Sequence, residues 1–197
     1  MLTGPLDLGL GLLGSADHLQ HAQKALQAGA IKKARYETLA ASADVDRAQR
    51  GLHSSSPLFD LASLSTTIKD ALDQVDHLVA AARFSSDAAE GTLDIAQNAL
   101  KGPDKVISRV DPEDPKSDAF IRLDRITDIS QTISEVRNDI EGVARELKAV
   151  DLSKLPHRAR RPIEDGIDQA TETDDLLADA EAGFAVLPGF LGADGKR

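Results

Sequence analysis

Eight apolar residues in the third quarter of the chain follow an unbroken alternation of three- and four-residue steps. This spacing is the a/d pattern of a coiled-coil seam, and it is held for more than three heptads. It predicts a helix over about 118–150 that packs along one narrow stripe, and it indicates a packing surface rather than a binding site. The seam consists of Ile126, Ile129, Ile133, Val136, Ile140, Val143, Leu147 and Val150.

Comparable stripes predict three further helices, over about 15–53, 57–100 and 157–186. The segment Ala28-Gly29-Ala30 either bends the first of them or divides it into two helices of a short hairpin, because an interior glycine weakens a helix. The stripe of the 57–100 helix is Leu61, Leu64, Ile68, Leu72, Val75, Val79, Ala82, Ser86, Ala89, Leu93, Ala96 and Leu100.

Turn-forming and capping residues give the expected helix boundaries. Ser15 is expected to cap the first helix, and Ser56 with Pro57 is expected to start the second after a turn at 53–57. Pro188-Gly189 is expected to end the last helix. The segment 101–117 contains turn residues and three prolines, so it is expected to be a linker, and no strand is predicted.

Long helices joined by short turns lie antiparallel to their neighbours. The sequence therefore predicts an all-α fold, an elongated antiparallel four-helix up-down bundle with coiled-coil-like seams over 15–187. We expect the 57–100 and 118–150 helices to form its central pair, with their seams facing each other. A flexible leader over 1–14 and a linker over 188–197, leading to a domain missing from this chain, complete the predicted organisation.

Composition excludes several classes of function. Aromatic residues make up 3% of the chain and tryptophan is absent, which argues against an aromatic-walled pocket or a base-stacking surface. The net charge of −10 repels phosphate backbones, so we expect no nucleic-acid partner. The chain has no cysteine, which excludes disulfides and thiolate catalysis. No apolar stretch of about 18 residues indicates a membrane span.

Acidic residues are concentrated in the last helix, where a solvated face or a docking face for a basic partner would explain them. They are Glu164, Asp165, Asp168, Glu172, Asp174, Asp175, Asp179 and Glu181. One dense basic patch lies at the turn before that helix and consists of Lys154, His157, Arg158, Arg160 and Arg161. These side chains either counter nearby acidic helix ends or contact an anionic polymer or lipid head group at one tip of the bundle.

Three groups of residues resemble sites in part, and we expect no metal, cofactor or catalytic residue from them. His18 and His21 lie beside Asp17, but a metal site needs three or four convergent ligands. Asp73 and His77 have the spacing of a surface ion pair. A third group lacks the glycine and closing glutamate of an EF-hand calcium loop. It comprises Asp111, Glu113, Asp114 and Asp118.

The C-terminal stretch Leu187–Arg197 (LPGFLGADGKR) resembles a recurring join in the actinobacterial membrane-anchored family called domain of unknown function 4012. In that family a long helical region ends in a similar stretch, and a globular domain follows. Leu26 and Gly29 before an alanine-rich run, and the turn Ser56-Pro57-Leu58, are also similar to the family. The resemblance implies an extracytoplasmic helical leader of a membrane-anchored envelope protein, whose anchor is absent from this chain. It implies no catalytic residue.

These observations favour a non-enzymatic extracytoplasmic helical stalk or interaction module that is itself soluble and is a monomer or weak oligomer. Its partner would be a protein or a cell-envelope polymer. One alternative is a sensor-like four-helix domain that binds a small ligand between helices through Ser86, Thr173 and Asp174, polar residues suited to such a site. The other alternative is a cytosolic coiled-coil adaptor.

Overall fold

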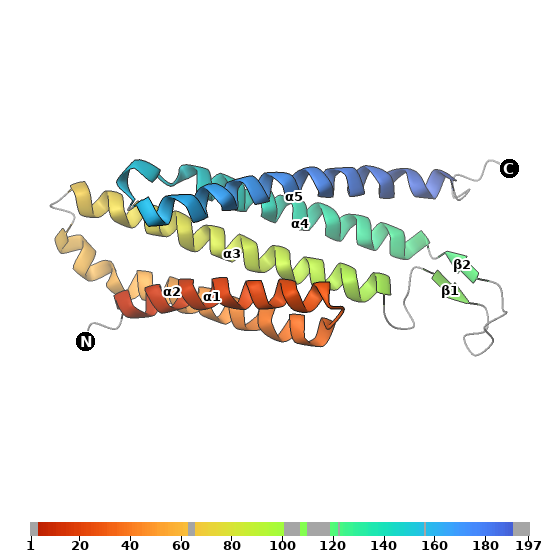
Figure 1. Cartoon of the computed structure of the whole chain (residues 1–197), viewed down its shortest axis with the longest axis horizontal. Coiled ribbons are helices and arrows are strands. Elements are labelled where there is room, and N and C mark those ends of the chain that lie inside the picture. Colours follow the sequence, from red (N-terminus) through yellow and green to blue (C-terminus); the bar gives the residue numbers. More distant parts are fainter. Residues whose placement is uncertain are drawn as a thin grey trace.

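The computed structural model describes residues 4–62, 66–100, 107–109, 119–121, 123–155 and 157–190. Five long helices dominate this part of the chain and give the molecule an elongated shape (Figure 1). The all-α prediction is confirmed, with five helices in place of the expected four. They are α1 (Gly4–Gln27), α2 (Ile31–Ala62), α3 (Thr66–Leu100), α4 (Leu123–Ala149) and α5 (His157–Phe190), with a short 3-10 helix, η1 (Leu152–Lys154), before α5.

The first predicted helix is divided at Gly29, so the hairpin alternative is the correct one. Gly29 has a φ of +68°, in the left-handed region that glycine adopts at little cost. Its N–H donates to the Leu26 carbonyl at 2.9 Å, and the Ala30 N–H donates to the Ala25 carbonyl at 2.8 Å. These two bonds form a Schellman motif, which ends α1 and lets the chain return as α2.

The prediction of a flexible leader over 1–14 is wrong from Gly4 onward, because α1 begins there. The apolar stripe of α1 already starts in this segment, where Gly11 is buried and Leu12 is half-buried. Ser15 is therefore not an N-cap. It lies inside α1, and its hydroxyl donates to the Leu12 carbonyl at 3.0 Å.

Small residues line the seam between α1 and α2. Ala34, Ala41 and Ala48 of α2 are fully buried at 0% exposure. A Cβ placed on Gly11 of α1 would lie 2.5 Å from the Asp44 carbonyl oxygen and 2.6 Å from the Ala48 backbone nitrogen. The two backbones therefore approach closely, because the distance between packed helices depends on the size of the side chains at the contact.

The central helix α3 uses two faces. Leu93 packs in one core cluster with Ala25, Ile31 and Ala34 of the α1–α2 hairpin. On the other face Phe84 lies against Gly142 of α4. The prediction that the Leu61–Leu100 stripe faces the Ile126–Val150 seam is therefore wrong, because Leu93 belongs to that stripe and packs on the hairpin. The face toward α4 includes the small buried residues Ala81 and Ala88, which the hydrophobic pattern did not reveal.

The helix α4 lies between α3 and α5 (Figure 1). Its predicted seam is confirmed, since six of the eight residues are buried and Ile140 and Leu147 are half-buried. Gly91 of α3 lies against Val136, and Gly166 of α5 lies against Leu147. Among the described residues the helices thus pack mainly in chain order, each against its sequence neighbours, with a smaller contact between α1 and α3.

Several predicted boundaries differ from the structure. No turn occurs at 53–57, where α2 continues, and α5 runs through Pro188-Gly189 to Phe190. A proline inside a helix removes one backbone hydrogen bond and tends to kink or break the helix, which is why a boundary was predicted at each of these positions.

Two short strands occur among the described residues, one in the predicted linker and one at the start of the predicted 118–150 helix, and the sequence did not indicate either. They are β1 (Ile107–Arg109) and β2 (Ala119–Ile121), and they pair antiparallel with Ser108 opposite Phe120. Because β2 occupies the expected start of the next helix, α4 begins at Leu123.

The close approach of α1 and α2 predicts opposite effects for two glycine substitutions. We expect Gly11→Ala to lower the free energy of unfolding by about 2 kcal/mol, because backbone atoms of α2 occupy the space of the new methyl group. Gly9→Ala is the matched control, since no atom lies within 4 Å of the place that its new methyl group would take. Gly9→Ala should raise stability by up to about 1 kcal/mol through helix propensity. Chemical denaturation measures both, and equal effects would contradict this packing.

Candidate functional site

The basic patch at 154–161 divides into two groups. Lys154 Nζ lies 2.7 Å from Asp70 Oδ2 of α3, and this hydrogen bond raises the pKa of Lys154. Arg160 donates from Nε to the Leu155 carbonyl at 3.0 Å and from Nη2 to the Ser153 carbonyl at 3.3 Å. Lys154 thus counters an acidic residue near the start of α3, as the charge-countering interpretation expects, whereas Arg160 bonds backbone carbonyls of the turn between α4 and α5.

The remaining residues of the patch, His157, Arg158 and Arg161, are all exposed. Arg161 Nε lies 3.9 Å from Asp165 Oδ2 on the same helix, with both side chains largely exposed. An ion pair of this kind contributes little to stability. The contact of these three residues with an anionic partner stays a prediction.

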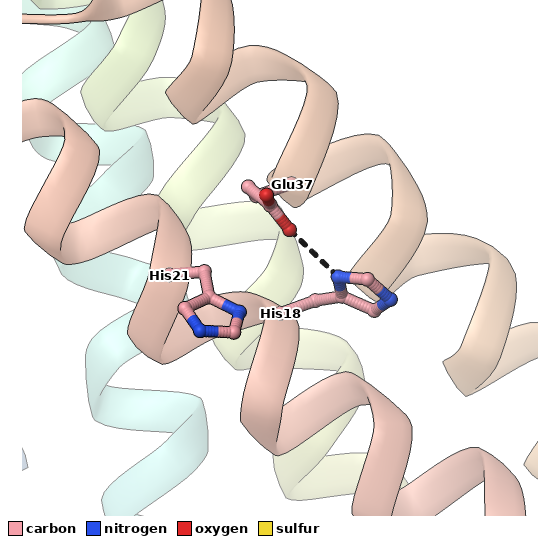
Figure 2. Close-up of side chains that lie close together, drawn as sticks. All are labelled: His18, His21 and Glu37. Carbon is pink, nitrogen blue, oxygen red and sulfur yellow. Dashed lines mark hydrogen bonds and ion pairs between the residues drawn. The ribbon is translucent and has the colours of Figure 1, made fainter.

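Two histidines of α1 and one glutamate of α2 form a cluster that spans the hairpin (Figure 2). One ligand atom from each of His18, His21 and Glu37 lies within 4.8 Å of the others. His18 Nδ1 and Glu37 Oε2 are 2.8 Å apart, which is hydrogen-bond distance. The Glu37 side chain is 13% exposed and that of His21 is 47% exposed, so the cluster has a buried side and an open side.

Two more carboxylates adjoin this cluster. Asp44 Oδ2 of α2 lies 3.9 Å from His18 Nε2, the ring nitrogen that faces away from Glu37. Asp17 Oδ2 lies 3.6 Å from His21 Nδ1. Gly14 of α1 makes room for Asp44, because a Cβ at that position would collide with the Asp44 carboxylate.

The sequence indicated His18, His21 and Asp17 but missed Glu37 and Asp44. Those two residues come from the other side of the hairpin turn, so no short spacing connects them to the histidines. If Gly29 is taken to divide the helix, the buried stripe of Ala34, Ala41 and Ala48 indicates how α2 faces α1. That register would have placed Glu37 and Asp44 near the histidines. The calcium candidates Asp111, Glu113, Asp114 and Asp118 lie outside the described residues.

His77 has a different partner from the one its spacing suggested. Its Nδ1 lies 2.8 Å from Glu146 Oε2 of α4 rather than bonding to Asp73 on its own helix. This hydrogen bond lowers the pKa of Glu146. The predicted local ion pair is therefore replaced by a contact that joins α3 to α4, because the packing of α4 places a carboxylate within reach of the ring.

A charged cluster joins α4 to α5. Arg137 donates from Nε to Asp174 Oδ1 at 2.8 Å and from Nη1 to Glu181 Oε2 at 3.3 Å. The Ser134 hydroxyl also donates to Glu181. The hydrogen bonds from Ser134 and then Arg137 lower the pKa of Glu181, and those from Arg137 to Asp174 and Glu181 raise the pKa of the guanidinium.

The residues of the sensor-like alternative do not come together. Ser86 is buried in α3 at 2% exposure, and its hydroxyl has no hydrogen-bond partner among the described residues. Thr173 donates its hydroxyl to the Gln169 carbonyl on its own helix, and Asp174 pairs with Arg137. Asp174 also lines an open groove of about 390 Å³ between α4 and α5, to which Ser86 does not contribute.

The acidic residues of α5 face solvent, which agrees with the solvated-face interpretation. Six of the eight are exposed, and Asp174 and Glu181 are the two that turn toward α4. Within the described residues, none of the helices has the length and apolar character needed to cross a membrane.

The unpaired hydroxyl of Ser86 predicts that Ser86→Ala stabilises the protein by about 1 kcal/mol, since a buried hydroxyl without a partner costs free energy. Denaturant titration measures the change. Ser85→Ala is a suitable control, because the Ser85 hydroxyl donates to the Ala81 carbonyl at 2.9 Å. A loss of stability in Ser86→Ala would show that the hydroxyl has a partner.

The lowered pKa of Glu181 predicts a pH-dependent contribution to stability. A carboxylate whose pKa is lower in the folded state stabilises the fold above its ordinary pKa of 4.5, and this contribution is lost as the pH falls through the lowered pKa. We expect Glu181→Gln to be less stable than the native chain at pH 7 and the difference to shrink in acid. Thermal unfolding at several pH values checks this, with the exposed Glu172→Gln as control. A difference independent of pH would contradict it.

The resemblance rests most specifically on Leu187–Arg197, and residues 191–197 lie outside the described part of the chain. It stays a sequence-based prediction. A scan against models of protein families, a search of curated proteins and a search of solved structures each gave no match.

Proposed function

We propose that this chain is a non-enzymatic helical stalk and interaction module that holds the segments at its two ends apart. One observation carries the proposal. The start of α1 and the end of α5 lie at opposite ends of the long axis (Figure 1). Each antiparallel step reverses the direction of the chain, so an odd number of helices separates entry from exit, whereas four helices would bring them to the same end.

The dimensions support a spacer. The helices α3 and α5 contain 35 and 34 residues. At a rise of 1.5 Å per residue, each is about 50 Å long. The coiled-coil-like seam of α4 and contacts such as His77–Glu146 and Arg137–Asp174 join neighbouring helices along this length. Packed helices joined in this way keep their ends at a nearly fixed distance. The ends of a flexible linker with the same number of residues fluctuate widely.

The proposed setting is the cell envelope, with the stalk outside the membrane, as the resemblance to the domain of unknown function 4012 implies. The exposed acidic face of α5 favours a protein with a basic surface over an anionic envelope polymer, because like charges repel. A cytosolic coiled-coil adaptor is the alternative, and the same separation of the two ends would serve it. The separation of Ser86 from the groove that Asp174 lines does not favour the sensor-like alternative.

Distance measurements between spin labels test the separation of the ends. The chain has no cysteine, so pairs of labelling sites can be introduced without a background. Gly9 on α1 and Ala185 on α5 are exposed. We expect labels at Gly9→Cys and Ala185→Cys to lie on the order of 40 Å apart, since they occupy opposite ends of helices about 36–51 Å long.

The matched control pairs Gly9→Cys with Glu164→Cys, an exposed site near the start of α5. The two sites on α5 differ by about 30 Å along the helix axis, so the control distance should be clearly the shorter of the two. Equal distances, or a longer distance for the control pair, would overturn the proposed separation of entry and exit. Small-angle scattering that fitted a sphere would do the same.

A further inference from the structure

We propose that His18, His21 and Glu37 bind one divalent transition-metal ion of the zinc type, which would link α1 to α2. The two histidines lie on successive turns of one helix, and the glutamate comes from the facing helix (Figure 2). Neither helix alone supplies three ligands. The site exists because the hairpin turn at Gly29 brings the two helices together in this register.

The distances fit a three-ligand site after a small adjustment. Tetrahedral ligands at about 2.0–2.1 Å from zinc lie roughly 3.3 Å from each other. His18 Nδ1 and Glu37 Oε2 are 2.8 Å apart, and no two of the three ligand atoms are more than 4.8 Å apart. The exposed ring of His21 has room to turn toward the other two, whereas Glu37 is mostly buried and already contacts His18.

The carboxylates around the cluster strengthen the argument. Histidines that bind metals usually donate their other ring N–H to a carboxylate or a carbonyl, which fixes the ring and increases its basicity. Asp44 lies on the Nε2 side of His18, opposite Glu37, and Asp17 lies beside Nδ1 of His21. The two carboxylates lie 3.9 Å and 3.6 Å from these ring nitrogens, so a small side-chain movement would let each accept a ring N–H when the other nitrogen holds the ion.

The ligand set selects the class of ion. Two imidazoles and one carboxylate suit zinc and the neighbouring divalent ions cobalt and nickel, whereas calcium and magnesium prefer oxygen ligands. Because the open side of the cluster faces solvent, water would complete the coordination. This inference is independent of the stalk function, since the three residues lie on one hairpin at one side of the molecule.

The chain contains a matched control. His77 and Glu146 repeat the central contact at the same Nδ1–Oε2 distance of 2.8 Å between α3 and α4. Among the described residues, no second histidine joins that pair in a three-ligand cluster. One imidazole and one carboxylate bind metals weakly, so His77→Gln should leave the affinity unchanged while removing the same number of imidazoles as either histidine ligand variant.

The test is calorimetric titration of the chelator-treated protein with ZnCl2. We expect one ion per chain. Substitution of any ligand (His18→Gln, His21→Gln or Glu37→Gln) should weaken binding at least about 100-fold, because loss of a mere hydrogen-bond partner of a ligand already costs 10–100-fold. Asp44→Asn should weaken binding about 10-fold, and His77→Gln should change it less than about twofold. Calcium and magnesium should not compete.

A measurement on the unmodified chain keeps the inference testable if a variant fails to fold. Zinc should shift the imidazole NMR signals of His18 and His21, and cobalt should give the visible absorption of a site with nitrogen ligands. The inference is overturned if zinc shows no saturable binding. It is also overturned if binding persists unchanged in His21→Gln, or if the signals of other histidines shift instead.

Discussion

The central helix α3 has buried residues on two faces, and the arrangement of the other helices depends on this. Leu93 meets the α1–α2 hairpin on one side, while Phe84 and Gly91 meet α4 on the other. Gly91 and Leu93 differ by two positions, which places them about 200° apart around the helix. A helix with two apolar faces must be covered on both sides. The result is a series of layers in which α3 separates the hairpin from the α4–α5 pair.

The layered arrangement determines where the ends of the molecule lie. Because the helices pack mainly against their sequence neighbours, each connection reverses the chain direction, and the fifth helix ends far from the start of the first. The two outer layers keep one face in water. On α5 that face carries acidic residues. Asp174 and Glu181, the two acidic residues that point toward α4, pair with Arg137. The packing of α5 on α4 thus decides which acidic residues of α5 form ion pairs and which face solvent.

The α1–α2 hairpin shows how small residues can create a polar site. Gly11, Ala34, Ala41 and Ala48 allow the backbones to approach, and this proximity brings side chains of the two helices together above the seam. Glu37 reaches His18 across the seam, and Gly14 leaves space for Asp44. The histidine cluster is therefore a consequence of the same close approach that stabilises the hairpin.

The sequence by itself determined that the chain is helical and which stripes are buried, because the three- and four-residue spacing depends only on helix geometry. The α4 seam of isoleucine, valine and leucine and the capacity of Gly29 to break a helix were both readable in this way. The sequence did not show that α3 has a second face of alanine and glycine, since small residues give a weak hydrophobic signal. Only the tertiary structure decided that Gly29 makes a hairpin, that five helices result, and that His77 meets Glu146. Likewise, Glu37 and the two histidines become neighbours only through packing, because contacts between residues far apart in the chain depend on the register of whole helices.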